Sequence, residues 1–157
     1  MIKRRVLSFL AFLFSTFLST CVLAQAGGTV NAVAPLTRDL GALVKLSAQG
    51  TGTVNSSDQT GFNITRIICV FNQASHTGTP SSTFAIQNKD AASGAYYTLV
   101  TSAAITTDTT PTYLAVGDVA TAANVALSVP VARTWRVTTT VGGTTPTVTG
   151  TIGCSVQ

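Results

Sequence analysis

The chain of 157 residues carries little charge: nine Lys and Arg, five acidic residues that are all Asp, and a single His. Three of the nine basic residues stand at positions 3–5, so the other six Lys and Arg, set against five Asp, leave a net charge of about +1. A nucleic-acid surface needs clustered basic residues. These six are scattered, so nucleic acid is not expected as a partner.

The first 26 residues predict a signal peptide. A basic head at residues 3–5 precedes an apolar stretch at 6–18 and then Ala24-Gln25-Ala26, a small-x-small pattern that a signal peptidase accepts. We therefore expect cleavage after Ala26 and export to the periplasm, the extracellular space or the cell surface. The apolar stretch is shorter than the roughly 20 residues of a membrane span, so a retained anchor is the less favoured alternative.

Cys21 offers a second processing route. It follows Leu18-Ser19-Thr20, which resembles a loose lipobox, although Thr20 stands where Gly, Ala or Ser is usual. Lipidation at Cys21 is therefore an alternative by which the protein would be held at a membrane. Without it, no membrane contact is expected beyond the signal peptide. Cleavage after Ala26 leaves residues 27–157, the length of one domain.

The composition of residues 27–157 predicts an all-β domain. Glu is absent and β-branched residues are abundant, which favours strands over helices. Apolar and polar residues alternate over 43–49, 134–141 and 147–157, as in strands with one wet face. Further strands are expected at 29–35, 62–71, 82–87, 96–102, 111–116 and 124–129. We predict a single β-sandwich, jelly-roll or immunoglobulin-like, of about eight to nine short antiparallel strands.

Segments rich in Gly, Pro, Ser, Thr, Asn and Asp separate these strands and predict turns, two of them at 75–80 and 142–143. Residues 67–71 differ from the other strands because they are apolar on both faces. That pattern suits a central strand covered on both sides, or a subunit contact made by Ile67, Ile68, Val70 and Phe71. The expected partners are accordingly further copies of the chain or other structural proteins.

Two cysteines, Cys69 and Cys154, follow the predicted signal peptide. Export to an oxidising compartment allows them to form a disulfide. Two buried free thiols are the equally weighted alternative, because the sequence does not give the distance between their Cα atoms.

No residue pattern supports catalysis. His76 lies in the predicted 75–80 turn, and no Gly-x-Ser-x-Gly elbow accompanies it. All five Asp stand in or beside turn signals, where Asp commonly bonds its own backbone. Two cysteines and one histidine do not form a zinc-ligand pattern. We expect no catalytic residue, no metal site and no cofactor. A hydrolase that uses His76 and a serine is the least favoured hypothesis.

Aromatic residues are the best candidates for a binding surface. Tyr96, Tyr97 and Trp135 are able to stack on the apolar faces of sugar rings, so carbohydrate is a candidate ligand. The competing interpretation places Trp135 in the core, since it alternates with Arg136 in a predicted strand. Tyr96 and Tyr97 must point to opposite faces of an extended strand.

Two segments resemble a known family. Residues 87–106, QNKDAASGAYYTLVTSAAIT, and residues 133–137, RTWRV, are similar to stretches that small β-rich structural proteins of tailed phages and prophages often carry. The resemblance covers roughly residues 64–141, and here it is combined with a signal peptide. It implies a virion-associated role, such as capsid decoration or tail association, and implies that the quoted residues determine the fold.

These observations lead to two functional hypotheses. The first is a non-enzymatic structural module, a phage-type virion component or a surface protein derived from one. The second is a secreted or surface-anchored β-sandwich binding module, with carbohydrate as its candidate ligand. The predicted location follows the hypothesis: exported, or part of a virion.

Overall fold

The computed structural model describes residues 37–108 and 111–157. The predicted signal peptide, the cleavage site after Ala26, Cys21 and the predicted strand at 29–35 lie outside the described residues. Every regular element of the described part is a β-strand, which confirms the predicted all-β class. This part contains no helix long and apolar enough to cross a membrane.

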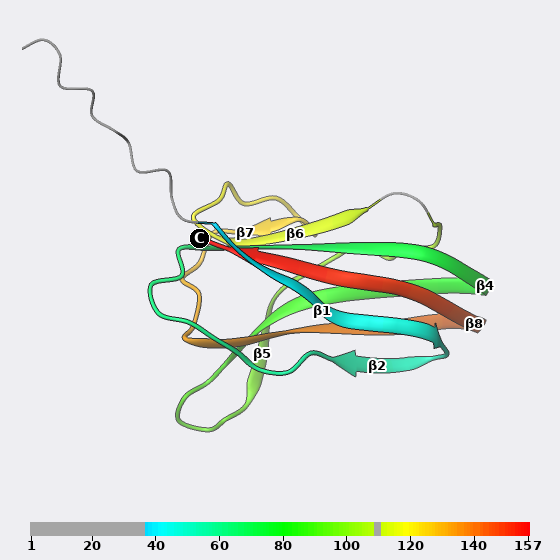
Figure 1. Cartoon of the computed structure of the whole chain (residues 1–157), viewed down its shortest axis with the longest axis horizontal. Helices are drawn as coiled ribbons and strands as arrows, with labels where there is room; N and C mark the ends of the chain where they lie inside the picture. Colours follow the sequence, from blue (N-terminus) through cyan, green and yellow to red (C-terminus); the bar gives the residue numbers. More distant parts are fainter. Residues whose placement is uncertain (1–36, 109–110) are drawn as a thin grey trace, which may run out of the picture. The chain divides into compact units, whose positions relative to one another are not determined.

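Eight strands form one sheet. They are β1 (Arg38–Gln49), β2 (Gly52–Asn55), β3 (Gln59–Thr60), β4 (Arg66–Lys89), β5 (Tyr96–Thr101), β6 (Thr112–Gly117), β7 (Ala126–Leu127) and β8 (Thr134–Val156). The order across the sheet is β1-β8-β4-β6-β7, with β2 and β3 also paired to β8 and β5 also paired to β4. The long β1, β8 and β4 run side by side in Figure 1.

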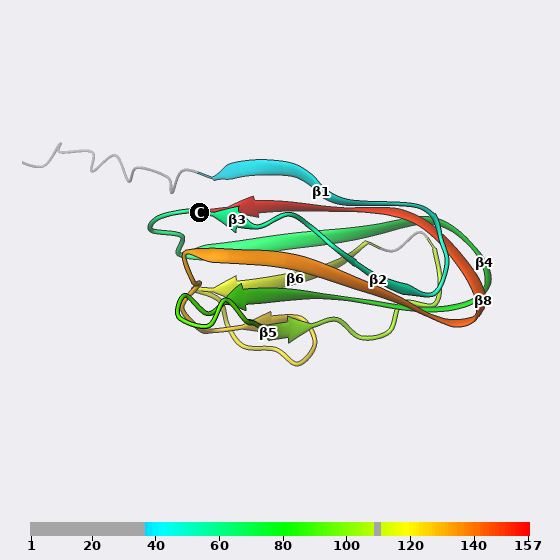
Figure 2. The same cartoon turned by 90° about the horizontal axis from the view of Figure 1, so that it is seen from below.

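The sheet is bent over into two layers, because β4 and β8 both turn back at the same end of the molecule (Figure 2). In the first layer, residues 66–71 of β4 pair with β6, and residues 148–156 of β8 pair with β1. In the second layer, residues 85–89 of β4 pair with β5, and residues 134–141 of β8 pair with β2 and β3. The sandwich is therefore made from one sheet, whose two layers share their longest strands.

The bend occupies the two segments for which the sequence predicts turns, and those predictions were wrong. Residues 75–80 and 142–143 lie inside β4 and β8, and pairing continues through them with register shifts between Gln73 and Ser75 and between Thr77 and Thr79. Bulges of this kind bend a strand without ending it. The four short strands expected around these segments are accordingly halves of two long ones of 24 and 23 residues.

Gly143 shows why the bend needs its glycine. Its φ is +110°, and a Cβ at this position would lie 1.9 Å from the carbonyl oxygen of Thr79 on the paired strand. Only a residue without a side chain lets the two backbones approach this closely. Glycines that predict a turn from the sequence instead allow the paired strands β4 and β8 to bend over without ending.

The core lies between the layers and follows the period of two that the sequence displays. Phe71 of the first layer meets Phe84 of the second, with ring centroids 5.8 Å apart. Trp135 is fully buried on the inner face of the second layer. The other large side chains that are buried completely or almost completely are Leu46, Ile67, Ile86, Leu114, Val116, Val137, Val141, Val148 and Ile152.

A disulfide joins the two central strands of the first layer. Cys69 of β4 and Cys154 of β8 are direct cross-strand partners, their Cα atoms are 4.1 Å apart, and both are buried. The structure therefore favours the disulfide over two free thiols. Because β4 and β8 carry the remaining strands, the bond fixes the register on which most of the pairing depends.

Two strand predictions need correction. The strand expected at 62–71 begins only at Arg66, and Phe62 lies exposed in the preceding loop. The strand expected at 124–129 is reduced to Ala126–Leu127, which pairs parallel to β6, so the sheet is mixed and not wholly antiparallel. Asn124, just before this short strand, has a positive φ of 56°, a left-handed conformation typical of turns.

Removing the disulfide should lower stability strongly. Replacing both Cys69 and Cys154 by Ala frees a segment spanning 85 positions, for which the chain-entropy model gives a loss of about 4–5 kcal/mol. We expect urea unfolding to report a loss of this size. Dithiothreitol should destabilise the native protein similarly and leave the double variant unchanged. Equal stability of the native and double-variant proteins would contradict the structural role of the bond.

The close approach of the Thr79 carbonyl oxygen should require glycine at position 143, in addition to the positive φ. Gly52 provides the matched control, because its φ is +143°, also outside the range of other residues, while a Cβ there would approach nothing closer than 4.0 Å. We expect Gly52→Ala to cost about 1–3 kcal/mol from backbone strain alone. Gly143→Ala should cost at least about 2 kcal/mol more, because backbone atoms must move. Similar losses in urea unfolding would refute the contact argument.

Candidate functional site

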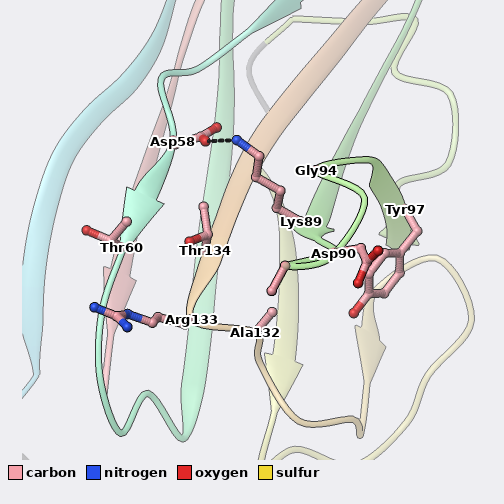
Figure 3. Close-up of a pocket in the computed structure, with 10 residues that line it drawn as sticks. Asp58, Thr60, Lys89, Asp90, Gly94, Tyr97, Ala132, Arg133 and Thr134 are labelled. Atoms are coloured by element: carbon pink, nitrogen blue, oxygen red, sulfur yellow. Dashed lines mark hydrogen bonds and ion pairs between the residues drawn. The ribbon is translucent and has the colours of Figure 1, made fainter.

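A cleft of about 690 Å³ opens beside the second layer (Figure 3). One side is formed by the segment around β3 and the other by the turn between β4 and β5. The segment that leads into β8 lies between them. The residues that line the cleft are Asp58, Thr60, Lys89, Asp90, Ala91, Gly94, Tyr97, Ala132, Arg133 and Thr134.

The β4–β5 turn is held by Asp90. Its carboxylate accepts hydrogen bonds from the backbone N–H of Ser93 at 2.9 Å and from the Ser93 hydroxyl. The backbone N–H of Asp90 donates to the carbonyl of Ala95, and the carbonyl of Asp90 accepts from the N–H of Gly94, so both hydrogen bonds close the turn. The hydrogen bonds from the Ser93 hydroxyl and backbone lower the pKa of Asp90, because they stabilise the charged form. The turn therefore presents a carboxylate to the cleft.

Asp58 is the centre of a polar cluster at the rim. It pairs with the Lys89 ammonium, with Nζ and Oδ2 2.8 Å apart, and it accepts a hydrogen bond from the Tyr96 hydroxyl. These two interactions, that of Lys89 first, lower the pKa of Asp58. The Asp58 bond likewise raises the pKa of Lys89. Both groups stay charged over the neutral range, and each neutralises the other.

The Tyr96 ring is enclosed by cations. The Arg136 guanidinium carbon lies 3.5 Å from the ring centroid, and the Lys89 nitrogen lies 5.3 Å from it. Arg136 also donates from Nε to the side-chain oxygen of Gln87 at 2.9 Å. Cation–π contacts of this kind orient both partners. Tyr96 is half-buried within this cluster and offers little ring surface to a ligand.

Arg133 and Tyr97 are the freer groups of the cleft. The Arg133 guanidinium carbon lies over the exposed Phe62 ring, 4.0 Å from its centroid, and Arg133 forms no ion pair within the described residues. The Tyr97 ring is 50% exposed, and the buried Asn88 donates to its hydroxyl at 3.4 Å. Each group is therefore held in place from behind while its outer surface remains accessible.

The cleft unites parts of the chain that lie far apart in sequence. Gln87 is the cross-strand partner of Arg136, and Asn88 is that of Trp135, so the end of β4 lies beside the start of β8. Both segments that carry the family resemblance contribute to the lining as a result. The loop at 61–65 is bonded to the residues that flank both ends of β8. Gly61 N donates to Arg133 O at 3.0 Å, and Thr65 N donates to Gln157 O at 2.7 Å.

The predicted aromatic surface is only partly present. Tyr97 is exposed and Tyr96 is half-buried, and they lie on opposite faces of β5 as extended neighbours must. Trp135 is wholly buried, so its inclusion in a binding surface was wrong. Sequence reasoning missed that Asp58, Thr60 and Arg133 share a cleft, because only the pairing of β3 with β8 brings them to it.

The predicted subunit contact also divides between two environments. Ile67 and Phe71 are 0% and 1% exposed and belong to the core, so they are not available to a partner. Val70 is 40% exposed on the opposite face, and Ile68 is half-buried there. The run is apolar on both sides because one face fills the sandwich and the other lines its outside.

His76 finds a carboxylate partner near the bend. Its Nδ1 lies 2.7 Å from Oδ1 of Asp108, which also accepts from Gln73 at 3.1 Å. The His76 bond is the main cause that lowers the pKa of Asp108. No serine hydroxyl is hydrogen-bonded to His76 in the described part of the chain, and no group of three His, Cys, Asp or Glu side chains gathers there as a metal site would require.

Comparisons with models of protein families, with curated proteins and with solved structures give no match for this chain.

The Asp58–Lys89 pair should contribute to acid stability. The folded pKa of Asp58 lies below its usual 3.8, so its contribution is present above pH 3.8 and is lost as the pH falls through the lower folded pKa. We expect Asp58→Asn to flatten the fall in urea midpoint between about pH 6 and pH 2. Lys89→Met should flatten it similarly, because it removes the main cause of the shift. Native-like slopes in both variants would contradict this assignment.

Proposed function

We propose that this chain is a non-enzymatic structural module that associates with further copies of itself, as a virion component of the tailed-phage type or as an exported surface protein derived from one. The observation that supports this most directly is an apolar area on the outside of the first layer. The buried Cys69–Cys154 disulfide is compatible with export, since such bonds persist in oxidising compartments.

The outer face of the first layer has an apolar centre. Val70 is the cross-strand partner of both Tyr113 and Gly153, and Val70 and Tyr113 are 40% and 54% exposed. Gly153 adds no side chain, which leaves Val70 and Tyr113 accessible from above. These residues lie on the central strands β4, β6 and β8, whose register the disulfide fixes. The face therefore offers a rigid apolar surface, of the kind that interfaces use.

The charges that flank this centre favour a second copy as the partner. Asp39 pairs with Ser155 and Lys45 pairs with Thr151, so they lie on β1 on either side of the row that contains Gly153. Both are exposed. A two-fold axis along that row would bring Asp39 of each copy against Lys45 of the other. Self-complementarity of this type is what an isologous dimer interface requires.

Self-association is testable with the full chain, expressed with its own N-terminus and recovered from an oxidising compartment. We expect light scattering after size exclusion to report a dimer or a larger assembly. Tyr113→Asp should raise the dissociation constant at least about tenfold, because it buries a charge in the contact. Phe62→Asp, which alters an exposed aromatic residue elsewhere, is the matched control. A monomeric native protein, or an unaffected Tyr113→Asp variant, would refute the proposal.

Charge reversal tests the two-fold geometry itself. Lys45→Asp places like charges opposite each other in both symmetric contacts and should weaken association by roughly three- to tenfold. The double variant D39K/K45D restores opposite charges and should recover most of the native affinity. Failure of the second change to compensate the first would exclude this arrangement of the copies, even if the protein is oligomeric.

A further inference from the structure

We propose that the cleft between the β3 segment and the β4–β5 turn binds an uncharged pyranose unit of a glycan. This goes beyond the proposed self-association, which uses the outer face of the first layer and none of the residues that line the cleft. The two surfaces lie on different layers of the sandwich, so each can be tested without the other.

The charges of the lining point to a neutral ligand. Two carboxylates, Asp58 and Asp90, stand against two cations, Lys89 and Arg133. The Asp58–Lys89 pair is closed at 2.8 Å, and the Asp90 carboxylate already accepts hydrogen bonds within its own turn. The Arg133 guanidinium is the charged group that remains for a ligand. With no net charge in the lining, neither anions nor cations are drawn in selectively. A ligand rich in hydroxyl groups, which donate and accept, suits this combination best.

Polar groups line both sides of the cleft. Figure 3 shows Asp90 with Tyr97 on one side and Arg133 with Thr60 on the other, while Thr134 lies between the two sides. Asp90 accepts hydrogen bonds and Arg133 donates them in a planar fork. The hydroxyl groups of a sugar ring both donate and accept hydrogen bonds. Each side of the cleft therefore offers polar groups that suit a hydroxyl-bearing ligand.

Tyr97 supplies the apolar surface that a sugar ring needs. Its ring is half-exposed, and the hydrogen bond from buried Asn88 to its hydroxyl limits its freedom before any ligand arrives. Arg133 is similarly supported by Phe62. Groups that are ordered in advance lose less conformational entropy on binding. The cleft volume of about 690 Å³ also lies within the range of about 300–1,000 Å³ typical of small-ligand sites.

The test begins with a glycan array probed with the full exported chain, comparing neutral glycans with sialylated, uronic-acid and sulfated ones. We expect binding to neutral glycans. The best neutral oligosaccharide is then titrated in solution by NMR, so that the affinity of a single site is measured whatever the oligomeric state. Tyr97→Ala and Arg133→Met should each weaken binding by about tenfold or more, since each removes one of the main contacts.

Tyr113→Ala is the matched control, because it removes an exposed tyrosine from the other layer and should leave the affinity unchanged. Arg133→Met guards against misfolding, since Arg133 is exposed and its loss leaves the core intact. Binding of acidic glycans alone would overturn the proposal, as would the absence of glycan binding or native affinity in both cleft variants. None of these results bears on self-association, which light scattering reports separately.

Discussion

The antiparallel pairing of β4 with β8 is the interaction on which the rest of the structure depends. The two strands stay paired along their whole length. The pairing begins with Ile67 and Val156, continues through the bend, and ends with Asn88 and Trp135. Every other strand except β7 pairs with one of these two. Since the pair folds back on itself, a single set of backbone hydrogen bonds creates both layers and brings their inner faces together. The disulfide between Cys69 and Cys154 fixes its register in the first layer.

Folding the pair over itself has a consequence for the surface. Segments that begin and end the long strands come to the same end of the sandwich, where the 61–65 loop connects Arg133 of the second layer with Gln157 of the first. Loops and strand ends carry irregular polar groups, whereas the middle of the sheet carries regular alternation. The polar cleft consequently lies where the strand ends meet, and the flat apolar area lies over the central strands.

The sequence predicted the faces of the strands better than their ends. Alternation over 134–141 and 147–157 correctly separates core from surface, because a side-chain period of two survives any pairing partner. The alternation over 43–49 holds only as far as Leu46, since the register shifts before Gln49 and Ala48 is exposed. Residues 75–80 and 142–143 misled the prediction, since a bulged bend needs the same Gly, Pro and Thr as a turn. Which of these two forms depends on whether the partner strand bends with it, and that is a tertiary property. The cleft was not predicted for the same reason, since Asp58 and Arg133 reach the same cleft only because β3 pairs with β8.

Two different kinds of surface on one rigid support fit a module that both pairs with a second copy and binds a ligand. The outer face of the first layer is apolar at its centre and has Asp39 and Lys45 on either side, whereas the cleft is polar and balanced in charge. Association through the central strands would leave the strand ends, and hence the cleft, facing away from the contact. Pairing of two copies would then present two clefts together, and bivalent presentation raises the overall affinity without any new contact. A cleft of modest individual affinity for one sugar ring would be effective in this setting, because the dimer would supply the avidity.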